Sequence, residues 1–169
     1  MEAEQLVEEV RLWNTPIFGA YLLWRFTQGY CLEHPNGDAP IVLLHFVASA
    51  MLTNQKLLNS ISNRRQDLQS FVRGFEDTKN SDVLLNIHER VIEKREFTLA
   101  AIDLAVCKDL LVWDMDSGKL FPQENPKPKS NKKILMVKFE KEGEKAEILG
   151  KWFSKLELPT IASYLKVVF

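Results

Sequence analysis

The chain has 169 residues, with 22 Lys and Arg against 23 Asp and Glu, and 46% of its residues are hydrophobic. These proportions are typical of one globular domain, and a chain of this length buries about 68–70% of its extended surface without disulfides or a metal. A net charge of −1 and this size exclude a disulfide-stapled miniprotein, a disordered tail and a polycation that coats nucleic acid. We therefore expect a single domain over residues 1–169.

Cysteine content and the N-terminal sequence predict a cytoplasmic protein. Cys31 and Cys107 are too few for a disulfide framework or a four-thiolate zinc site. The N-terminal sequence MEAEQLVEEV is acidic where a signal peptide is basic, and no apolar stretch reaches about 18 residues. We expect no membrane segment, no metal and no cofactor.

Helical patterns follow one another through the first half of the chain. Thr15 and Pro16 predict an N-cap and a first helical residue, and the helix that runs to Tyr30 has apolar residues around most of its circumference. Such a helix is expected at the centre of the core or against a partner. Further helices are predicted to start at Pro40, to be capped by Asn63, and to run from Ser81 or Asp82 to about Arg95.

A helix capped by Thr98 and then a β-hairpin are predicted next. The segment from Leu110 to Phe121 alternates apolar and polar residues around a turn at residues 116–118, which ends in glycine. Two helices followed by a hairpin is the order of a winged helix. The predicted fold class is mainly α, a compact helical domain with a winged-helix-like helix-helix-β-hairpin in the second half.

The last part of the chain is predicted to be a loop followed by elements that pack back on the helical core of residues 1–121. Residues 122–133 contain three prolines, four lysines and no bulky apolar residue, which is typical of a solvated loop. Residues 134–139 predict a strand. Helices are expected in the remainder of 134–169, with a break at Leu158 and Pro159.

The sequence has no motif for nucleotide binding or hydrolysis. P-loop, Rossmann, HExxH, paired CxxC and GxSxG patterns are all absent. Cys31, His34 and His45 are the nearest approach to a metal cluster, but no fourth ligand lies near them in sequence, so core or cap roles are favoured. An enzyme that uses His34, His45 or His88 is a minor hypothesis, because His88 beside Glu89 could support acid–base chemistry.

The charged residues predict little direct reading of DNA. The helix that would enter the major groove carries Asp103, Lys108 and Asp109 on its outer face, and phosphate repels such an acidic surface. A winged helix here is therefore expected to contact protein. A winged-helix DNA-binding regulator is kept as the alternative function. Seven basic residues, on one predicted helix and in the loop, are candidates for DNA-backbone contact or are solvated charge: Arg64, Arg65, Arg73, Lys127, Lys129, Lys132 and Lys133.

Four tryptophans and ten phenylalanines are many for a small helical domain. They either fill the core or leave an apolar patch that binds another subunit. His88 is predicted to form a hydrogen bond at the edge of the core, with its neighbours facing solvent or a partner. The predicted partner contacts are Trp24, Phe26, Glu89, Arg90, Trp152 and Phe153.

Several segments resemble the small middle components of three-component ABC systems. They are NTPIFGAYLLWRFTQGY at residues 14–30, IVLLHFVASAML after Pro40, LLNIHERV at 84–91 with FTLAAIDLAV after it, KLFP at the end of the hairpin, and GKWFSKLELPTIASYLKV at 150–167. Together these segments cover over half of the chain in the order of the family. Such bacterial operons encode an ABC ATPase of the structural-maintenance-of-chromosomes (SMC) type, a middle subunit and an effector, and the Lamassu antiphage systems are among them.

The resemblance implies a non-enzymatic assembly subunit. In Lamassu-type systems the small subunit has no catalysis of its own and associates with the ATPase and with a nuclease effector, so that foreign DNA releases the activity of the effector. The expected partners are therefore an SMC-like ABC ATPase and a nuclease effector. DNA is expected to be contacted indirectly or through its backbone without sequence specificity.

Overall fold

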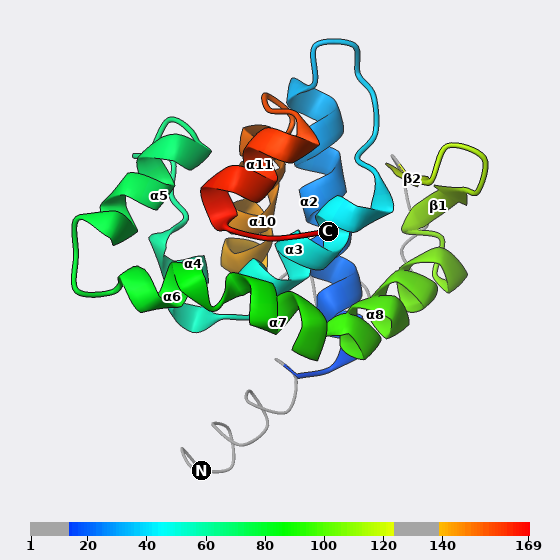
Figure 1. Cartoon of the computed structure of the whole chain (residues 1–169). Coiled ribbons are helices and arrows are strands. Elements are labelled where there is room, and N and C mark those ends of the chain that lie inside the picture. Colours follow the sequence, from blue (N-terminus) through cyan, green and yellow to red (C-terminus); the bar gives the residue numbers. More distant parts are fainter. Residues whose placement is uncertain (1–13, 124–138) are drawn as a thin grey trace.

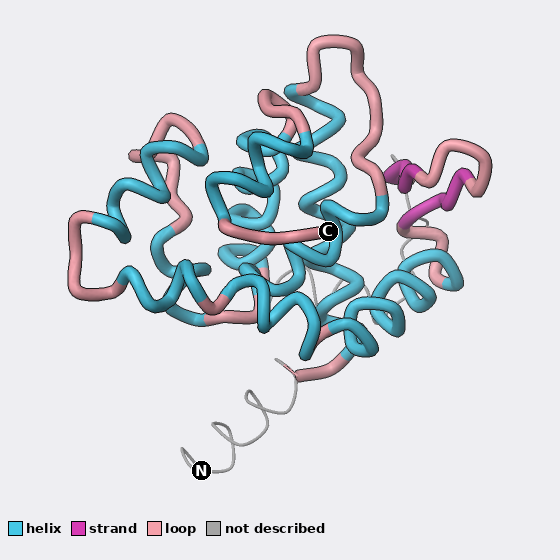
Figure 2. The backbone as a smooth tube through the Cα atoms, in the orientation of Figure 1, coloured by secondary structure: helices cyan, strands magenta, loops and turns pink. Residues whose placement is uncertain are grey.

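The computed structural model describes residues 14–123 and 139–169, and these form nine helices and one two-stranded antiparallel sheet (Figure 1). The prediction of a mainly helical domain with a hairpin in its second half is confirmed, as the backbone trace also shows (Figure 2). In chain order the elements are α2 (Pro16–Glu33), α3 (Val42–Leu52), α4 (Gln55–Ser60), α5 (Leu68–Glu76), α6 (Ser81–Leu85), α7 (Ile87–Glu93), α8 (Arg95–Cys107), β1 (Leu111–Asp114), β2 (Lys119–Pro122), α10 (Glu140–Phe153) and α11 (Leu158–Leu165).

Helix α2 lies at the centre of the fold, with α10 and α8 packed along it (Figure 1). Its N-cap is Thr15, whose carbonyl oxygen accepts hydrogen bonds from the N–H groups of Phe18 and Gly19, and Pro16 is the first helical residue. Buried residues occur on all sides of the helix. This confirms the prediction drawn from its apolar circumference, because a helix that is apolar all round is stable only when it is covered all round.

Two glycines allow α2 and α10 to approach closely. A Cβ atom at Gly150 would lie 2.0 Å from the carbonyl oxygen of Phe26, and one at Gly29 would lie 2.1 Å from the carbonyl oxygen of Glu147. No side chain fits at either point unless the helices separate. The Arg25 guanidinium adds an ion pair across the same contact, 2.9 Å from the Glu147 carboxylate.

Helix α3 begins two residues later than the sequence predicted. The predicted start, Pro40, is held by the hairpin, because its carbonyl oxygen accepts a hydrogen bond from the Leu120 N–H at 3.1 Å. The next residue, Ile41, pairs with Lys119 as an isolated antiparallel bridge. A contact distant in sequence therefore keeps this segment extended until Val42.

Two predicted helix caps are wrong. Asp67, and not Asn63, caps α5, since its Oδ1 accepts a hydrogen bond from the Ser70 N–H at 2.8 Å. Thr98 is buried inside α8, where its hydroxyl hydrogen-bonds to Ser49 Oγ at 2.8 Å. For α5 a nearby residue, Asp67, was an equally good cap by type. Helix α8 instead starts after Lys94, which makes no side-chain cap hydrogen bond, so residue type did not select its start.

The predicted helix from residue 81 to residue 95 is divided into α6, α7 and the start of α8. The helix is interrupted by single turn residues at Asn86, which keeps right-handed helical backbone angles, and at Lys94. Asparagine is a weak helix former, which accounts for the first break. The short helix α4, capped by the Asn54 side chain, was not predicted.

The hairpin and its glycine turn match the prediction, and the structure adds the register of the strands. Leu111 pairs with Pro122 and Asp114 with Lys119, and Gly118 has a φ of 67° at the left-handed position of the turn. Because Pro122 belongs to β2, the predicted loop does not begin there. The predicted strand at 134–139 and the four loop lysines fall outside the described residues, apart from Phe139.

Candidate functional site

A surface cleft of about 520 Å³ lies between the α3–α4 corner and helices α6 and α7. Two of the predicted partner contacts, Glu89 and Arg90, line it. We call it the α7 cleft. Its lining residues are Thr53, Asn54, Gln55, Lys56, Val83, Asn86, Glu89, Arg90 and Glu93.

Arg90 joins α7 to the end of α3. Its Nε donates to the carbonyl oxygen of Ala50 at 3.2 Å, and its Nη2 donates to Thr53 Oγ1 at 3.4 Å. Ala50 lies in the last turn of α3, where helix carbonyl groups have no partner within the helix and a cation complements the helix dipole. Arg90 therefore has a structural role, and because it also lines the α7 cleft its contact with a partner stays a prediction.

Glu89 and Glu93 lie one turn apart on α7, and both are exposed. Neither carboxylate forms an ion pair with the described residues. Like charges at positions i and i+4 of a helix repel each other. Glu89 thus stays a predicted partner contact, and Glu93 joins it as a residue that the sequence analysis missed.

Exposed apolar side chains lie beside the α7 cleft. Leu85 is 55% exposed and Ile92 is 62% exposed, and we call this pair the α7 ridge. His88, three residues after Leu85 and four before Ile92, is half-buried and accepts a hydrogen bond from the Val168 N–H at 3.3 Å. The predicted hydrogen bond of His88 at the edge of the core is confirmed, and it brings exposed Val168 and Phe169 to the same side of α7.

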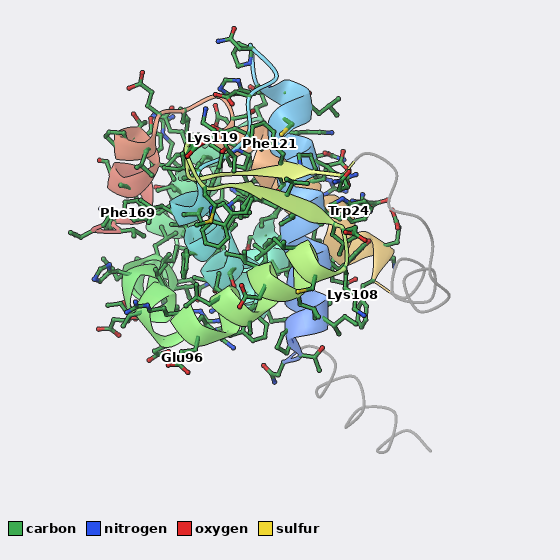
Figure 3. The ribbon with its side chains drawn as sticks, turned by 90° about the vertical axis from the view of Figure 1, so that its right-hand side faces the viewer. Trp24, Glu96, Lys108, Lys119, Phe121 and Phe169 are labelled. Atoms are coloured by element: carbon green, nitrogen blue, oxygen red, sulfur yellow. The ribbon has the colours of Figure 1, made fainter. Side chains whose placement is uncertain are left out.

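The hairpin carries a second group of exposed apolar side chains. Val112 and Phe121 are directly opposite each other in the register of β1 and β2, so they share one face, and Met115 is exposed at the turn. We call these three residues the hairpin face. Figure 3 shows Phe121 on the hairpin and Phe169 on a different side of the molecule.

The four aromatic residues that were predicted to contact a partner lie in the core instead. The Phe26 and Phe153 rings meet edge to face, with centroids 5.5 Å apart, and Trp152 lies 5.7 Å from Phe71. Trp24 is also buried, and its indole N–H donates to the Gln123 carbonyl oxygen at 3.3 Å. This corrects the prediction, because aromatic content reports how much surface must be covered and not whether the chain itself covers it.

The three histidines and Cys31 do not assemble into a metal site. His45 is fully buried, with Nε2 2.8 Å from Thr27 Oγ1, and burial lowers its pKa to about 4. His34 Nδ1 accepts a hydrogen bond from the Asp38 N–H at 3.2 Å. Within residues 14–123 and 139–169, no group of three His, Cys, Asp or Glu residues is arranged to hold a metal ion.

The two cysteine thiols are expected to react at different rates. Cys31 is half-buried in α2, where burial raises the pKa of its thiol to about 11, whereas Cys107 is exposed at the end of α8. Because the thiolate is the reactive form, a disulfide-exchange reagent at pH 8 should find one fast thiol per chain. Cys107→Ser should remove this fast phase, and Cys31→Ser should leave it intact. Two fast thiols of equal rate would contradict the assignment.

The sequence predicts Arg64, Arg65 and Arg73 on one helix, and the structure shows that they are not. Arg64 and Arg65 precede α5, and Arg73 lies within it. Arg65 is half-buried, and its Nη1 donates to the Ser70 carbonyl oxygen at 2.9 Å, so it stabilises the start of α5. Arg64 and Arg73 are exposed and stay predicted DNA-backbone contacts; Lys127, Lys129, Lys132 and Lys133 lie outside the described residues.

Among the described residues, no helix is both long enough and apolar enough to span a bilayer.

Comparison with known proteins gives one family. The model of the family described as MC3, ABC-three component (ABC-3C) system Middle Component 3, matches residues 3–169. No curated protein and no solved structure gives a significant match. The match covers all the segments on which the resemblance to the middle components was based, and it confirms that resemblance.

Proposed function

Since the chain belongs to the Middle Component 3 family of ABC-three component systems, we propose that it is a non-catalytic accessory subunit of a bacterial antiphage defence complex. In this proposal it bridges an SMC-like ABC ATPase and a nuclease effector of a Lamassu-type system in the cytoplasm. It controls when foreign DNA activates the effector.

The observation that carries the proposal is the pair of separate apolar surfaces. The α7 ridge lies on α6 and α7, whereas the hairpin face lies on β1, β2 and their turn, so two different parts of the fold expose large hydrophobic side chains. Phe169, which is on the side of the ridge, and Phe121 of the hairpin face lie apart in Figure 3. The aromatic side chains of Trp24, Phe26, Trp152 and Phe153 are buried in the core. A bridging subunit requires two surfaces that two partners occupy at the same time. Exposed apolar clusters rimmed by polar residues are typical of protein interaction sites.

The non-catalytic part of the proposal is supported by the histidines. His34, His45 and His88 each form a hydrogen bond with a neighbouring backbone or hydroxyl group. These hydrogen bonds give each ring a structural role. The three histidines therefore do not require a catalytic function.

Reconstitution tests the bridging role. We expect co-expression of the chain with the ATPase and the effector encoded beside it to give one complex on size exclusion, and each of the two partners to bind the chain alone. Val112→Ser with Phe121→Ser should release one partner and retain the other, because it removes two of the three apolar side chains of the hairpin face and leaves the α7 ridge unchanged. No complex, or equal association of the ATPase and the effector without the chain, would contradict the proposal.

A winged-helix DNA-binding regulator is the second candidate. The order α7, α8, β1 and β2 supports it, and the exposed acidic residues Asp103 and Asp109 on and after α8 count against it. This candidate requires sequence-selective binding to duplex DNA that persists at moderate salt. Binding to any duplex alike, lost by about 200 mM salt, would leave only contact with phosphates.

A further inference from the structure

We propose that the α7 ridge and the α7 cleft together bind a basic amphipathic helix of a partner component. The inference rests on the proposed function and deepens it by stating the chemistry of one of the two partners. Three features of the described residues lead to it: an apolar ridge, two carboxylates that form no ion pair, and the engagement of Arg90 and Lys94 with other groups.

The apolar ridge defines one face of the occupant. Leu85 and Ile92 are seven residues apart and lie on the same side of the α6–α7 segment, with more than half of each side chain exposed. Val168 and Phe169, fastened to His88, extend this apolar surface. A helix with apolar residues spaced three and four apart covers such a ridge.

The two carboxylates define the charged edge of the occupant. Glu89 and Glu93 are interleaved with the ridge on α7 and repel each other. A Lys or Arg side chain placed between them relieves this repulsion. Nucleic acid is disfavoured at the same place, because its phosphates carry the charge of the carboxylates.

The basic residues near the cleft do not supply the missing cation. Arg90 donates to the end of α3, and the Lys94 ammonium lies over the Phe97 ring, 4.9 Å from its centroid. Lys56 lines the same cleft from α4 and forms no ion pair with Glu89 or Glu93. A second copy of the chain is disfavoured where the two-fold axis passes beside Glu89 and Glu93, since the carboxylates of the two copies would then face one another.

Charge reversal in the reconstituted complex tests the proposal. Glu89→Lys with Glu93→Lys is expected to weaken binding of one component at least tenfold and to leave the other component bound. Ile92→Glu should weaken the same component. The matched control is Glu76→Lys with Glu144→Lys, which makes the same change in charge at exposed residues of α5 and α10 and should change affinity less than twofold.

Zero-length carbodiimide cross-linking identifies the contact directly. We expect Glu89 or Glu93 to be joined to a lysine of the partner, and a Lys→Glu change at that lysine to restore binding of the charge-reversed chain. Affinity within twofold of the unaltered chain for the double reversal, or cross-links only between two copies, would overturn the inference while the complex itself still forms. If the unaltered chain bound neither component, the proposed function would fall, and this inference with it.

Discussion

Gly150→Ala is expected to lower the free energy of unfolding by about 3 kcal/mol or more, because the new methyl group has no room between α2 and α10. Its Cβ would lie 2.0 Å from the Phe26 carbonyl oxygen, which is backbone and cannot rotate away. The helices must separate, and the contact of Phe26 with Phe153 weakens with them. Urea unfolding followed by far-UV circular dichroism measures the loss.

Gly74→Ala is the matched control. There the new Cβ would meet the end of the Arg65 side chain at 2.2 Å, which can move aside by giving up its hydrogen bond to the Ser70 carbonyl oxygen, a loss of about 1 kcal/mol. Alanine offsets this loss, because it favours a helix interior by about 1 kcal/mol over glycine. We expect a change of less than about 1 kcal/mol. Equal losses for Gly74→Ala and Gly150→Ala would show that a general effect of the added methyl group, and not the close approach of α2 and α10, sets the cost.

Stability is expected to fall as the pH drops from 6.5 to 4, by about 3 kcal/mol in total, through the burial of His45. Burial lowers the pKa of His45 from 6.5 to about 4, so the folded protein holds the neutral ring. The unfolded chain binds the proton first, and acidification through this window therefore favours unfolding. Above pH 6.5 the contribution is fully present. Urea unfolding at pH 7, 6 and 5 should give a slope of about 1.4 kcal/mol per pH unit below pH 6.5.

Carboxyl groups do not produce the same slope in the upper part of this window. The pKa of Asp38 is lowered from 3.8, mainly by its hydrogen bond with Lys119. Burial raises the pKa of Glu147, but hydrogen bonds with Lys151 and Arg25 outweigh burial and lower this pKa from 4.5. Their stabilisation is lost only as the pH falls through these lower values. A change in the free energy of unfolding between pH 6.5 and 5 therefore reports the protonation of histidine.

Substitution separates the histidines from each other. His45→Gln should flatten the dependence between pH 6.5 and 5, whereas His34→Gln should retain it, because His34 lies near the surface at the end of α2. An unchanged slope in His45→Gln would assign the effect to another group.

The helix content, the hairpin and its turn could be predicted from the sequence because they depend on neighbouring residues. Proline after Thr15 starts α2, and Gly118 adopts the left-handed conformation that its turn requires. The apolar circumference of α2 predicted its central position for the same reason: residues three and four apart share a face whatever the rest of the chain does. Helix starts were less predictable, since Pro40 is held extended by Leu120, which is 80 residues away in the sequence.

The proposed partner surface could be predicted less well from the sequence than the helices and the hairpin. The sequence by itself determined a mainly helical fold, membership of the middle components and the position of Glu89 on an outer face. Only the packing decided that Trp24, Phe26, Trp152 and Phe153 are covered, that Arg90 is tied to α3, and that Leu85 and Ile92 stay exposed beside Glu93. The physical reason is that residue type fixes how much apolar surface a chain must bury, whereas the arrangement of its helices fixes which part stays open to a partner.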